Sequence, residues 1–345
     1  MMRAARLIGH GGNEAVEVAD HPLPQRRPGE VLVRMKAATL NRVDLYMRDS
    51  GAGITHSLPQ VMGVDGAGVV EAVDADEAQL RPGQPVLLYP GITCGRCEFC
   101  QRGEVVLCSR MKLLGEHRDG TLAQFVSLPA ANCFPIPPGY SHAQAAALGV
   151  NHLTAWRMVH TKARLRPWET LLVLGVGGGV SLAALQLGLA CGARVIVSSR
   201  DAGKLTRARA LGADVGIDTS KEDLAKAVLA ATGGRGVDVV IENIGGPMWS
   251  AALKCLVRGG RIVTCGATIG DQPGADLRRV FIRQLQIFGS TLGEPGELAD
   301  LLRLCGQGGL QPVIDASYPL AEVHAALDHL ESGRQFGKIA IEIEA

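Results

Sequence analysis

The sequence predicts an α/β protein with a doubly wound parallel sheet and a second, mainly β region. A chain of 345 residues is longer than one hydrophobic core usually supports, so we expect two domains. From about residue 150 onward, short apolar strands alternate with helical patterns. Before residue 150, β-branched runs are separated by Pro and Gly, and helical periodicity is scarce. These changes predict three segments, 1–150, 151–290 and 291–345.

In the first segment, the strand candidates are runs in which apolar and β-branched residues cluster between turn residues. They cover 31–37, 66–73 and 85–89, and Pro82-Gly83 marks the turn before the third run. This segment is expected to be mainly β.

The middle segment carries six strand candidates, most of them separated by helical patterns such as 203–211 and 221–232. Strands that alternate with helices form parallel, doubly wound sheets. After 290 we expect a helix, a strand, a second helix and a last strand, and this tail could pack on the first segment. The middle strands are 171–174, 194–199, 215–218, 237–242, 261–265 and 286–289, and the tail elements are 295–305, 312–318, 321–331 and 338–342.

Charge and hydropathy exclude several classes of protein. Lys and Arg total 35 and Asp and Glu total 34, a balance without the basic footprint of nucleic-acid or anionic-membrane binding. Residues 171–193 form an uncharged stretch long enough to span a bilayer. Its glycines and its change from strand-like to helical spacing favour a buried strand, a Gly turn and a buried helix instead. With no signal peptide in the sequence, we expect a soluble, cytoplasmic protein.

Four cysteines lie together in the segment 94–108, as Cys94, Cys97, Cys100 and Cys108. Four thiolates satisfy tetrahedral Zn²⁺ and leave no open coordination position, so the pattern predicts one structural zinc ion. The alternatives are an iron–sulfur cluster and a nucleic-acid-binding zinc module, although nearby basic residues are few.

A Gly-rich turn connects the strand candidate 171–174 to a helical stretch that reaches Ala190. Glycines here allow a tight turn and let the backbone approach a pyrophosphate, which then faces the helix N-terminus. The alternative is a turn needed only for helix–sheet packing. The strict G-x-G-x-x-G pattern fails at its last position. The turn reads Gly175, Val176, Gly177, Gly178, Gly179, Val180.

The next strand candidate ends at Ser198, Ser199 and Arg200, with Lys204 one helical turn later. An acidic side chain usually meets a free ribose 2′-hydroxyl at this place. Hydroxyls and a guanidinium suit a 2′-phosphate instead, so this sequence predicts NADP(H). The alternative is a solvated basic loop that accepts both coenzymes.

Two loops that follow later strands carry further coenzyme candidates. Asn243 comes after strand 237–242, and Gly266 and Thr268 come after strand 261–265. Loops at the carboxyl ends of parallel strands surround the dinucleotide in such sheets. Ordinary Gly turns are the alternative interpretation.

The cysteine group and the Gly turn, in this order, resemble the medium-chain dehydrogenase/reductase superfamily over essentially the whole chain. Gly63-x-Asp65-Gly66-x-Gly68 and the C-terminal Gly337-Lys338-Ile339 extend the resemblance. It implies a doubly wound Rossmann nucleotide-binding domain, and a mainly β GroES-like catalytic domain that carries the structural zinc lobe at 94–108.

The zinc alcohol dehydrogenases of this superfamily hold a catalytic zinc through a Cys, a His-Glu pair and a third Cys or acidic residue. Here Asn41 stands at the first place, Val64-Asp65 at the second, and Asn151 near the third. Val64 cannot bind a metal and Asn41 is a poor soft-metal ligand, so a catalytic zinc is not expected. The active-site pattern is similar to the zinc-free quinone oxidoreductase branch.

This resemblance implies hydride transfer from NADPH to a quinone or an α,β-unsaturated carbonyl. Such an acceptor spreads charge to an oxygen that hydrogen bonds can hold, so it needs no Lewis acid. By analogy, the site residues would be Asn41, Asp44, Tyr46 and Thr154, with Tyr46 as proton donor or as a plain cleft wall.

Two other functions stay open. One is an NAD(P)-dependent alcohol dehydrogenase with an unusual metal site built from Asp44, Asp65 and His152. The other is a nucleotide-binding protein without turnover. The expected partners are a small electrophilic substrate and further copies of the chain in a homodimer or homotetramer, in which 257–292 could pair sheets. No nucleic acid and no membrane are expected as partners.

Overall fold

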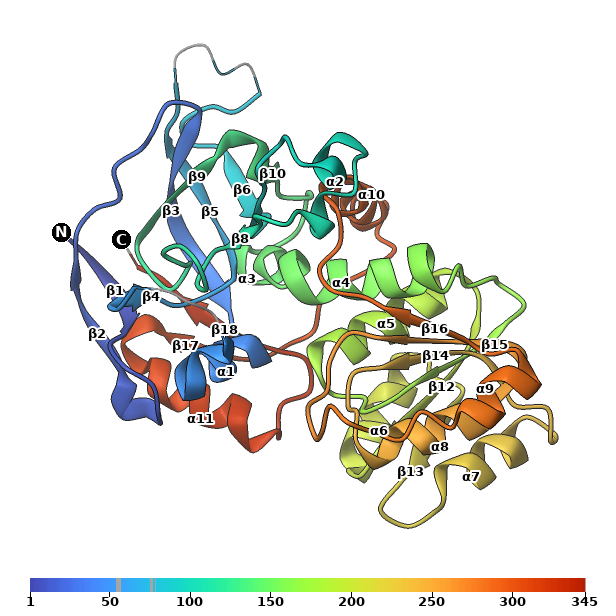
Figure 1. Ribbon diagram of the computed structural model, residues 1–345. Helices are drawn as coiled ribbons and strands as arrows, with labels where there is room; N and C mark the ends of the chain where they lie inside the picture. The colour runs from blue at the N-terminus through green and yellow to red at the C-terminus, as the bar shows by residue number, and fades with distance from the viewer. Residues whose placement is uncertain (54–56, 75–76, 78, 345) are drawn as a thin grey trace. The chain divides into compact units, whose positions relative to one another are not determined.

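The computed structural model describes residues 1–53, 57–74, 77 and 79–344 (Figure 1). The chain divides into two compact units. Unit 1 comprises Met1–Asn151 and Glu294–Ala345, and unit 2 comprises His152–Gly293. The C-terminal tail is therefore part of unit 1, where its last strand, β18 (Lys338–Glu342), pairs with β3 (Glu30–Thr39).

Unit 1 is built around a seven-stranded sheet, in which strands run in the order β10-β6-β5-β3-β18-β17 and β9 also pairs with β3. Alternate residues of β3 show why it forms, because Val31, Val33 and Met35 are fully buried on one face. A smaller sheet has the order β2-β1-β4, and β7 pairs with β8. The strands of unit 1 are β1 (Met2–Leu7), β2 (Val16–His21), β3, β4 (Gln60–Val61), β5 (Asp65–Ala72), β6 (Pro85–Leu88), β7 (Gly91–Ile92), β8 (Lys112–Leu113), β9 (Phe125–Pro129), β10 (Cys133–Pro135), β17 (Ile314–Pro319) and β18.

One helix of unit 1 departs from the sequence analysis, which gave the first segment little helical structure. Residues 42–50 form α1 (Arg42–Ser50), started by a capping box in which Asn41 and Asp44 satisfy each other's backbone N–H groups. Gly51 ends it in the left-handed conformation, with φ of 70°. The other helices of unit 1 are α2 (Glu98–Gln101), α3 (His142–Ala146), α10 (Pro295–Gly306) and α11 (Val323–Ser332).

Unit 2 is a six-stranded parallel sheet with the order β13-β12-β11-β14-β15-β16. The order reverses between β11 and β14, and right-handed crossovers therefore send the first and later helices to opposite faces. In keeping with this, α4 packs on α5, whereas α7 packs on α8. The strands are β11 (Thr170–Val173), β12 (Arg194–Ser199), β13 (Val215–Asp218), β14 (Val237–Glu242), β15 (Leu256–Thr264) and β16 (Gln286–Gly289), and the helices are α4 (Leu153–Trp156), α5 (Gly179–Ala190), α6 (Ala202–Ala210), α7 (Leu224–Ala231), α8 (Pro247–Cys255) and α9 (Leu277–Arg283).

The uncharged stretch 171–193 is divided between β11, the Gly turn and α5. Most of α5 is buried, including Leu182, Leu185 and Leu187, because it is covered by the sheet and by α4. Among the described residues, no helix is both long and apolar enough to cross a membrane. The predicted fold class, a doubly wound parallel sheet with a second, mainly β domain, is confirmed.

Candidate functional site

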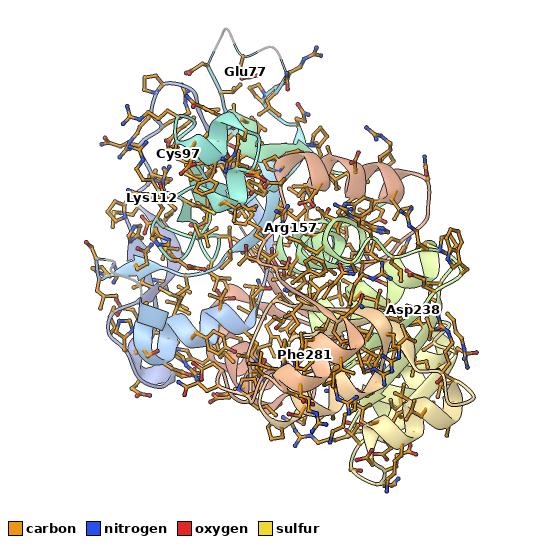
Figure 2. All side chains as sticks on the ribbon, turned by 45° about the vertical axis from the view of Figure 1, so that its right-hand side comes forward. Glu77, Cys97, Lys112, Arg157, Asp238 and Phe281 are labelled. Carbon is orange, nitrogen blue, oxygen red and sulfur yellow. The ribbon has the colours of Figure 1, made fainter. Side chains whose placement is uncertain are left out.

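The four cysteines of 94–108 converge in a lobe of unit 1 formed by α2 and the β7–β8 pair. Their sulfurs all lie within 4.8 Å of one another, with Sγ–Sγ distances of 4.0 Å for Cys94–Cys100 and 3.5 Å for Cys97–Cys100. A tetrahedron of sulfurs about 2.3 Å from zinc has edges of about 3.8 Å, so this set fits Zn²⁺. Figure 2 labels Cys97 within the lobe. The lobe is a structural zinc site.

Polar groups around the lobe favour the charged form of the Cys94 sulfur, whereas burial raises the pKa of Cys100 to about 11. The backbone N–H of Arg96 is the main cause that lowers the pKa of Cys94 to about 6. The guanidinium of Arg110 donates to Cys94 Sγ at 3.3 Å, and the backbone N–H of Cys94 donates to Cys108 Sγ at 3.4 Å. Such N–H···S contacts orient thiolate ligands around a metal.

The Gly-rich turn of unit 2 lies directly after β11, at the point where the strand order reverses. Gly175 and Gly177 have φ values of 65° and 119°, which few other residues adopt. Gly178 precedes α5, and no side chain caps the first amides of this helix. An uncapped N-terminus beside a tight Gly turn fits the pyrophosphate of a dinucleotide. Gly179 and Val180 are the first two residues of α5.

The other predicted coenzyme residues of unit 2 lie at the carboxyl ends of neighbouring strands. Asn243 follows β14 and donates to Ser181 Oγ of α5 at 3.2 Å. Thr268 follows β15 and donates to the Asn243 carbonyl at 2.9 Å, beside Gly266. These contacts join the loops after β14 and β15 to the helix of the Gly turn, so they form one edge.

At the end of β12 the structure offers hydroxyl and cationic groups. Ser199 Oγ accepts from the backbone N–H of Asp201 at 3.1 Å, and the Asp201 carboxylate caps α6 by accepting from the Lys204 N–H. The aliphatic part of Lys204 lies against the turn, since a Cβ on Gly177 would be 2.6 Å from Lys204 Cδ. Arg200 is exposed. The nearest carboxylate is thus engaged in helix capping.

One of the predicted catalytic residues, Asn41, belongs to a buried polar group of unit 1 that we call the Lys338 centre: Thr39, Asn41, Asp65, Asn151 and Lys338. Lys338 Nζ donates to Asp65 Oδ2 at 3.1 Å and to Asn41 Oδ1 at 2.7 Å. Asn41 Nδ2 also donates to Asp65 Oδ2, at 2.9 Å, and Asn151 Nδ2 donates to Asn41 Oδ1 at 2.9 Å. Burial lowers the pKa of Lys338, and the carboxylate of Asp65 opposes that shift.

Lys338 is the residue of this centre to which the sequence analysis assigned no role. The signal that could have found it is a lysine that opens the apolar strand Lys338-Ile339-Ala340-Ile341. A lysine that is 2% exposed needs a buried partner. The partner is Asp65, more than two hundred residues earlier in the chain.

The Lys338 centre does not fit a catalytic zinc ion. It contains no thiolate and no imidazole, and the neighbouring Val64 is aliphatic and 3% exposed. The alternative metal set takes Asp44 and Asp65 from unit 1 and His152 from unit 2. Asp44 Oδ2 accepts from the Asn41 backbone N–H, and His152 belongs to unit 2, where its Nε2 lies 3.3 Å from Gln186 Oε1. Among the residues that the structure describes, only the four cysteines group as metal ligands.

Two buried carboxyl groups lie near this centre. Burial raises the pKa of Asp44 to about 7, while the Asn41 N–H and Lys338 counteract the shift and Asp65 and Glu116 add to it. Burial also raises the pKa of Glu116 to about 7. Glu116 was not predicted, and no sequence pattern around it indicates its burial.

The remaining predicted residues lie in different settings. Tyr46 is on α1 and its side chain is 40% exposed. Thr154 is buried on α4 in unit 2. Arg48, also on α1 but not assigned to the site, is held by Asp49 and Glu331, which gives it a structural role in unit 1.

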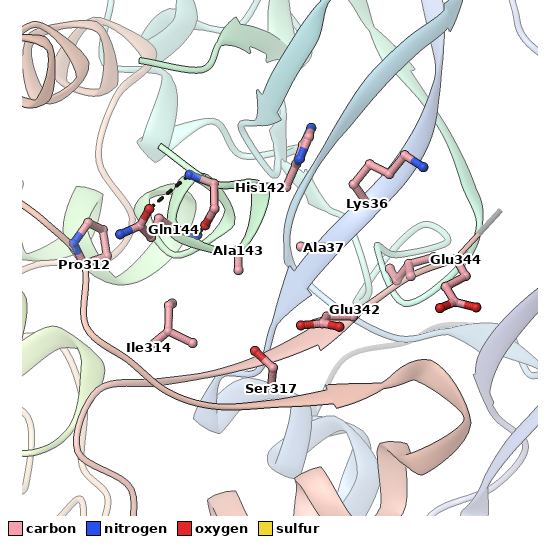
Figure 3. Close-up of a pocket in the computed structure, with 12 residues that line it drawn as sticks. Lys36, Ala37, His142, Ala143, Gln144, Pro312, Ile314, Ser317, Glu342 and Glu344 are labelled. Atoms are coloured by element: carbon pink, nitrogen blue, oxygen red, sulfur yellow. Dashed lines mark hydrogen bonds between the residues drawn. The ribbon is translucent and has the colours of Figure 1, made fainter. Parts of the chain in front are cut away.

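A separate surface pocket of unit 1 is drawn in Figure 3. Lys36, His142 and Glu342 line it, and the dashed line is the 3.0 Å bond from the Ser141 N–H to Gln144 Oε1. None of the predicted site residues lines this pocket.

The fold and the zinc lobe define a class: a two-unit α/β protein with a doubly wound parallel sheet and a structural zinc lobe. Comparison with known proteins agrees with this class. The model of the alcohol dehydrogenase GroES-like domain matches residues 27–138, and that of the zinc-binding dehydrogenases matches residues 179–307.

Whole-length relatives narrow the class. An NAD-dependent alcohol dehydrogenase of Sulfurisphaera tokodaii is 29% identical over 98% of this chain and 99% of its own length. A zinc-type alcohol dehydrogenase-like protein of Schizosaccharomyces pombe is 30% identical over 99% of this chain and 100% of its own length. The crystal structure of an NAD-dependent alcohol dehydrogenase superposes with a TM-score of 0.96 at 42% identity, covering 99% of this chain and 100% of that one.

The chain therefore belongs to the zinc-containing alcohol dehydrogenase family of the medium-chain dehydrogenase/reductase superfamily. Superfamily membership is confirmed. The assignment to the quinone oxidoreductase branch, and with it the reduction of quinones or enones, is wrong, because these relatives are alcohol dehydrogenases. The prediction failed because it weighed a few substituted active-site positions above the similarity of the whole chain.

Proposed function

We propose that this protein is a nicotinamide-dependent alcohol dehydrogenase, which moves a hydride between the carbinol carbon of an alcohol and the coenzyme. The observation that carries the proposal is the dinucleotide edge of unit 2 in a chain that matches alcohol dehydrogenases from end to end. The small-molecule substrate would be an alcohol, or the corresponding aldehyde or ketone in the reverse direction.

Coenzyme binding would use the carboxyl edge of the unit 2 sheet. The pyrophosphate would face the first amides of α5, whose partial positive charge favours an anion. Gly175 and Gly177 keep side chains away from the backbone there, and the loops of Asn243 and Thr268 would border the nicotinamide half. The coenzyme supplies the hydride chemistry, and the protein positions it.

On the substrate side, Asn41, Asp44, Tyr46 and Thr154 stay proposals. Asn41 is held from three sides by Asp65, Lys338 and Asn151, so its amide is fixed. Tyr46 has an exposed side chain, which suits a hydroxyl that exchanges a proton with substrate. Asp44 is buried and bonded to the Asn41 N–H, so its role would be to set the start of α1.

The coenzyme preference is a finer part of the proposal. Two of the three named relatives are NAD-dependent alcohol dehydrogenases. In this chain, Ser199 and Arg200 end β12 and Asp201 is engaged in capping α6, which supports use of NADP(H) in this chain. Arg200→Ala should then lower kcat/KM with NADP(H) by about tenfold and leave the value with NAD(H) within about twofold. Equal effects on both coenzymes would contradict it.

The function is tested by coenzyme reduction with a panel of primary and secondary alcohols, and by coenzyme oxidation with the matching aldehydes and ketones. Gly177→Ala should abolish turnover, since φ of 119° is strained for alanine and the new Cβ would meet Lys204. Gly296→Ala is the matched control, because a Cβ there meets open space.

Failure of the whole panel, with coenzyme still bound, would favour the nucleotide-binding protein without turnover. Loss of coenzyme binding in the wild type would contradict the dinucleotide site itself. If Gly177→Ala leaves turnover unchanged, the coenzyme does not bind at the Gly-rich turn.

We also propose that the chain forms a homo-oligomer through the β16 edge of unit 2. β16 pairs with β15 alone in the described part of the chain, and its Ile287 is 42% exposed. On the preceding helix, α9, Leu277 and Phe281 are 71% and 69% exposed (Figure 2 labels Phe281). An unpaired edge beside exposed apolar side chains is suited to a second copy. Phe281→Glu should reduce the mass measured by light scattering. Trp168→Glu should not, although Trp168 is also exposed.

Cytoplasmic location stays a prediction.

A further inference from the structure

The Lys338 centre already contains a cation with all its donors in use. An ammonium group has three N–H donors. Those of Lys338 reach the Leu40 carbonyl at 2.8 Å, Asn41 Oδ1 at 2.7 Å and Asp65 Oδ2 at 3.1 Å. Lys338 is 2% exposed and Asp65 fully buried. The three acceptors thus fix the position of the Lys338 ammonium group within the centre.

The acceptors that a metal would need are also in use. Asp65 Oδ2 accepts from Thr39 Oγ1 at 2.9 Å as well as from Asn41 and Lys338. Asn41 Oδ1 accepts from Lys338 and from Asn151. These atoms could bind a metal only by giving up bonds to groups that would then be buried without partners, which is costly.

One carboxylate oxygen of the centre is left over. Asp65 Oδ1 is buried without a hydrogen-bond partner, and a Cβ on Gly149 would lie 2.9 Å from it. One oxygen is not a zinc site, since zinc in proteins takes three or four protein ligands, mostly nitrogen and sulfur. A dication there would also be repelled by the nearby ammonium.

We infer that this centre excludes a catalytic zinc ion, and that Lys338 provides the charge that neutralises Asp65 and positions Asn41. The chain then binds one zinc ion, in the cysteine lobe. The role of Asn41 in this inference rests on the proposed function. The predicted number of zinc ions per chain does not depend on whether the protein turns over alcohols.

Two measurements on the full-length protein test the inference. Elemental analysis gives the number of zinc ions per chain, and X-ray absorption spectroscopy at the zinc edge gives the atoms bound to zinc and their distances. After incubation with excess Zn²⁺ and desalting, we expect about one zinc per chain, surrounded by four sulfurs at about 2.3 Å. Cys97→Ser/Cys100→Ser should bring the zinc content close to zero. Two zinc ions per chain, or an average shell that mixes sulfur with nitrogen and oxygen, would overturn the inference. The spectroscopy of the wild type decides even if the double variant does not fold.

The role of the ammonium is tested by giving the centre soft ligands with and without Lys338. Asn41→Cys/Val64→His should stay at one zinc per chain, and the same variant with Lys338→Met added should bind a second. A second zinc in the presence of Lys338 would show that the ammonium does not exclude the metal. No second zinc in its absence would equally contradict that role.

The two proposals fail separately. Absence of alcohol turnover leaves the zinc count untouched and removes only the proposed function. A second zinc ion in the wild type removes the inference, whether or not alcohols are turned over.

Discussion

The cysteine lobe and the Lys338 centre, both in unit 1, bring together side chains that can carry charge. They differ in what stabilises them. In the cysteine lobe, only Cys108 is buried among residues 94–108, so there is almost no apolar core. In the Lys338 centre, Thr39, Asn41, Asp65 and Lys338 are all buried inside the main sheet. The lobe needs a bound metal to hold its shape, whereas the centre is held by surrounding strands and its own ion pair. One unit thus contains a region that depends on a bound metal cation and another that is stabilised by the cation of its own lysine.

The largest effect is expected in the cysteine lobe. Cys97→Ser should remove zinc and unfold residues 94–108, because zinc binding contributes on the order of 10 kcal/mol in small zinc domains. Hydrogen exchange should show complete loss of protection in the lobe, with unit 2 unchanged. Cys305→Ser, at a buried cysteine outside the lobe, is the control. If the amides of the lobe stay protected from hydrogen exchange without zinc, the lobe does not need the metal to hold its shape, and it does not differ from the Lys338 centre in this respect.

The next effect is expected at Lys338. Lys338→Met leaves the buried Asp65 without its cation, which should lower the free energy of unfolding by about 3–5 kcal/mol. Adding Asp65→Asn should recover part of that loss, since no unpaired charge remains. Urea unfolding of the single and double variants measures both values. A double variant less stable than Lys338→Met would mean that Asp65 stabilises the protein without needing the cation.

A smaller effect concerns pH. Burial keeps the Asp44 carboxyl protonated in the folded protein up to a pKa of about 7, whereas the pKa of a fully solvated aspartate is 3.8. Stability from this group therefore falls as pH rises between these values and levels off above about 7. Between about pH 5.5 and 8 the change should be on the order of 2 kcal/mol. Asp44→Asn should flatten the profile, and Asp20→Asn, at an exposed site, should not. Glu116 contributes in the same direction. An unchanged slope in Asp44→Asn would show that Asp44 is ionised in the folded protein.

The smallest effect is expected at Arg110, whose guanidinium donates to Cys94 Sγ from an exposed position. Arg110→Ala should speed zinc release to a chelator by about two- to threefold, since exposed charged contacts contribute little. Lys112→Ala, nearby and exposed, serves as the control. A tenfold faster release of zinc would mean that the contact between Arg110 and Cys94 Sγ stabilises zinc binding much more than an exposed contact usually does.

Much of unit 2 was predictable because its signals are local. Strands 194–199, 215–218, 237–242 and 286–289 lie where apolar runs placed them. β15 begins earlier than predicted, at Leu256, because Val237 pairs with Leu256 before a bulge. α1 was missed because its start depends on the reciprocal contacts of Asn41 and Asp44 rather than on a strong apolar stripe.

The branch within the family could not be read from single positions. Asn41 and Val64 argued for a zinc-free reductase, and the absence of soft ligands at the centre is visible in the structure. Yet the whole chain resembles alcohol dehydrogenases, so the same substitutions belong to a member of that family. Loss of ligand residues indicates what a centre cannot bind and does not by itself name the substrate.

By itself, the sequence determined the α/β class, the glycine turn and the cysteine lobe, because each is encoded by spacing within a few residues. Only the tertiary structure decided the Lys338 centre. Lys338 lies 273 residues from Asp65 and 297 from Asn41, and Asn151 lies 110 from Asn41. No local pattern encodes such distances. The antiparallel pairing of β18 with β3 and of β3 with β5 joins them, and burial then turns a lysine, an amide and a carboxylate into one charge-paired unit.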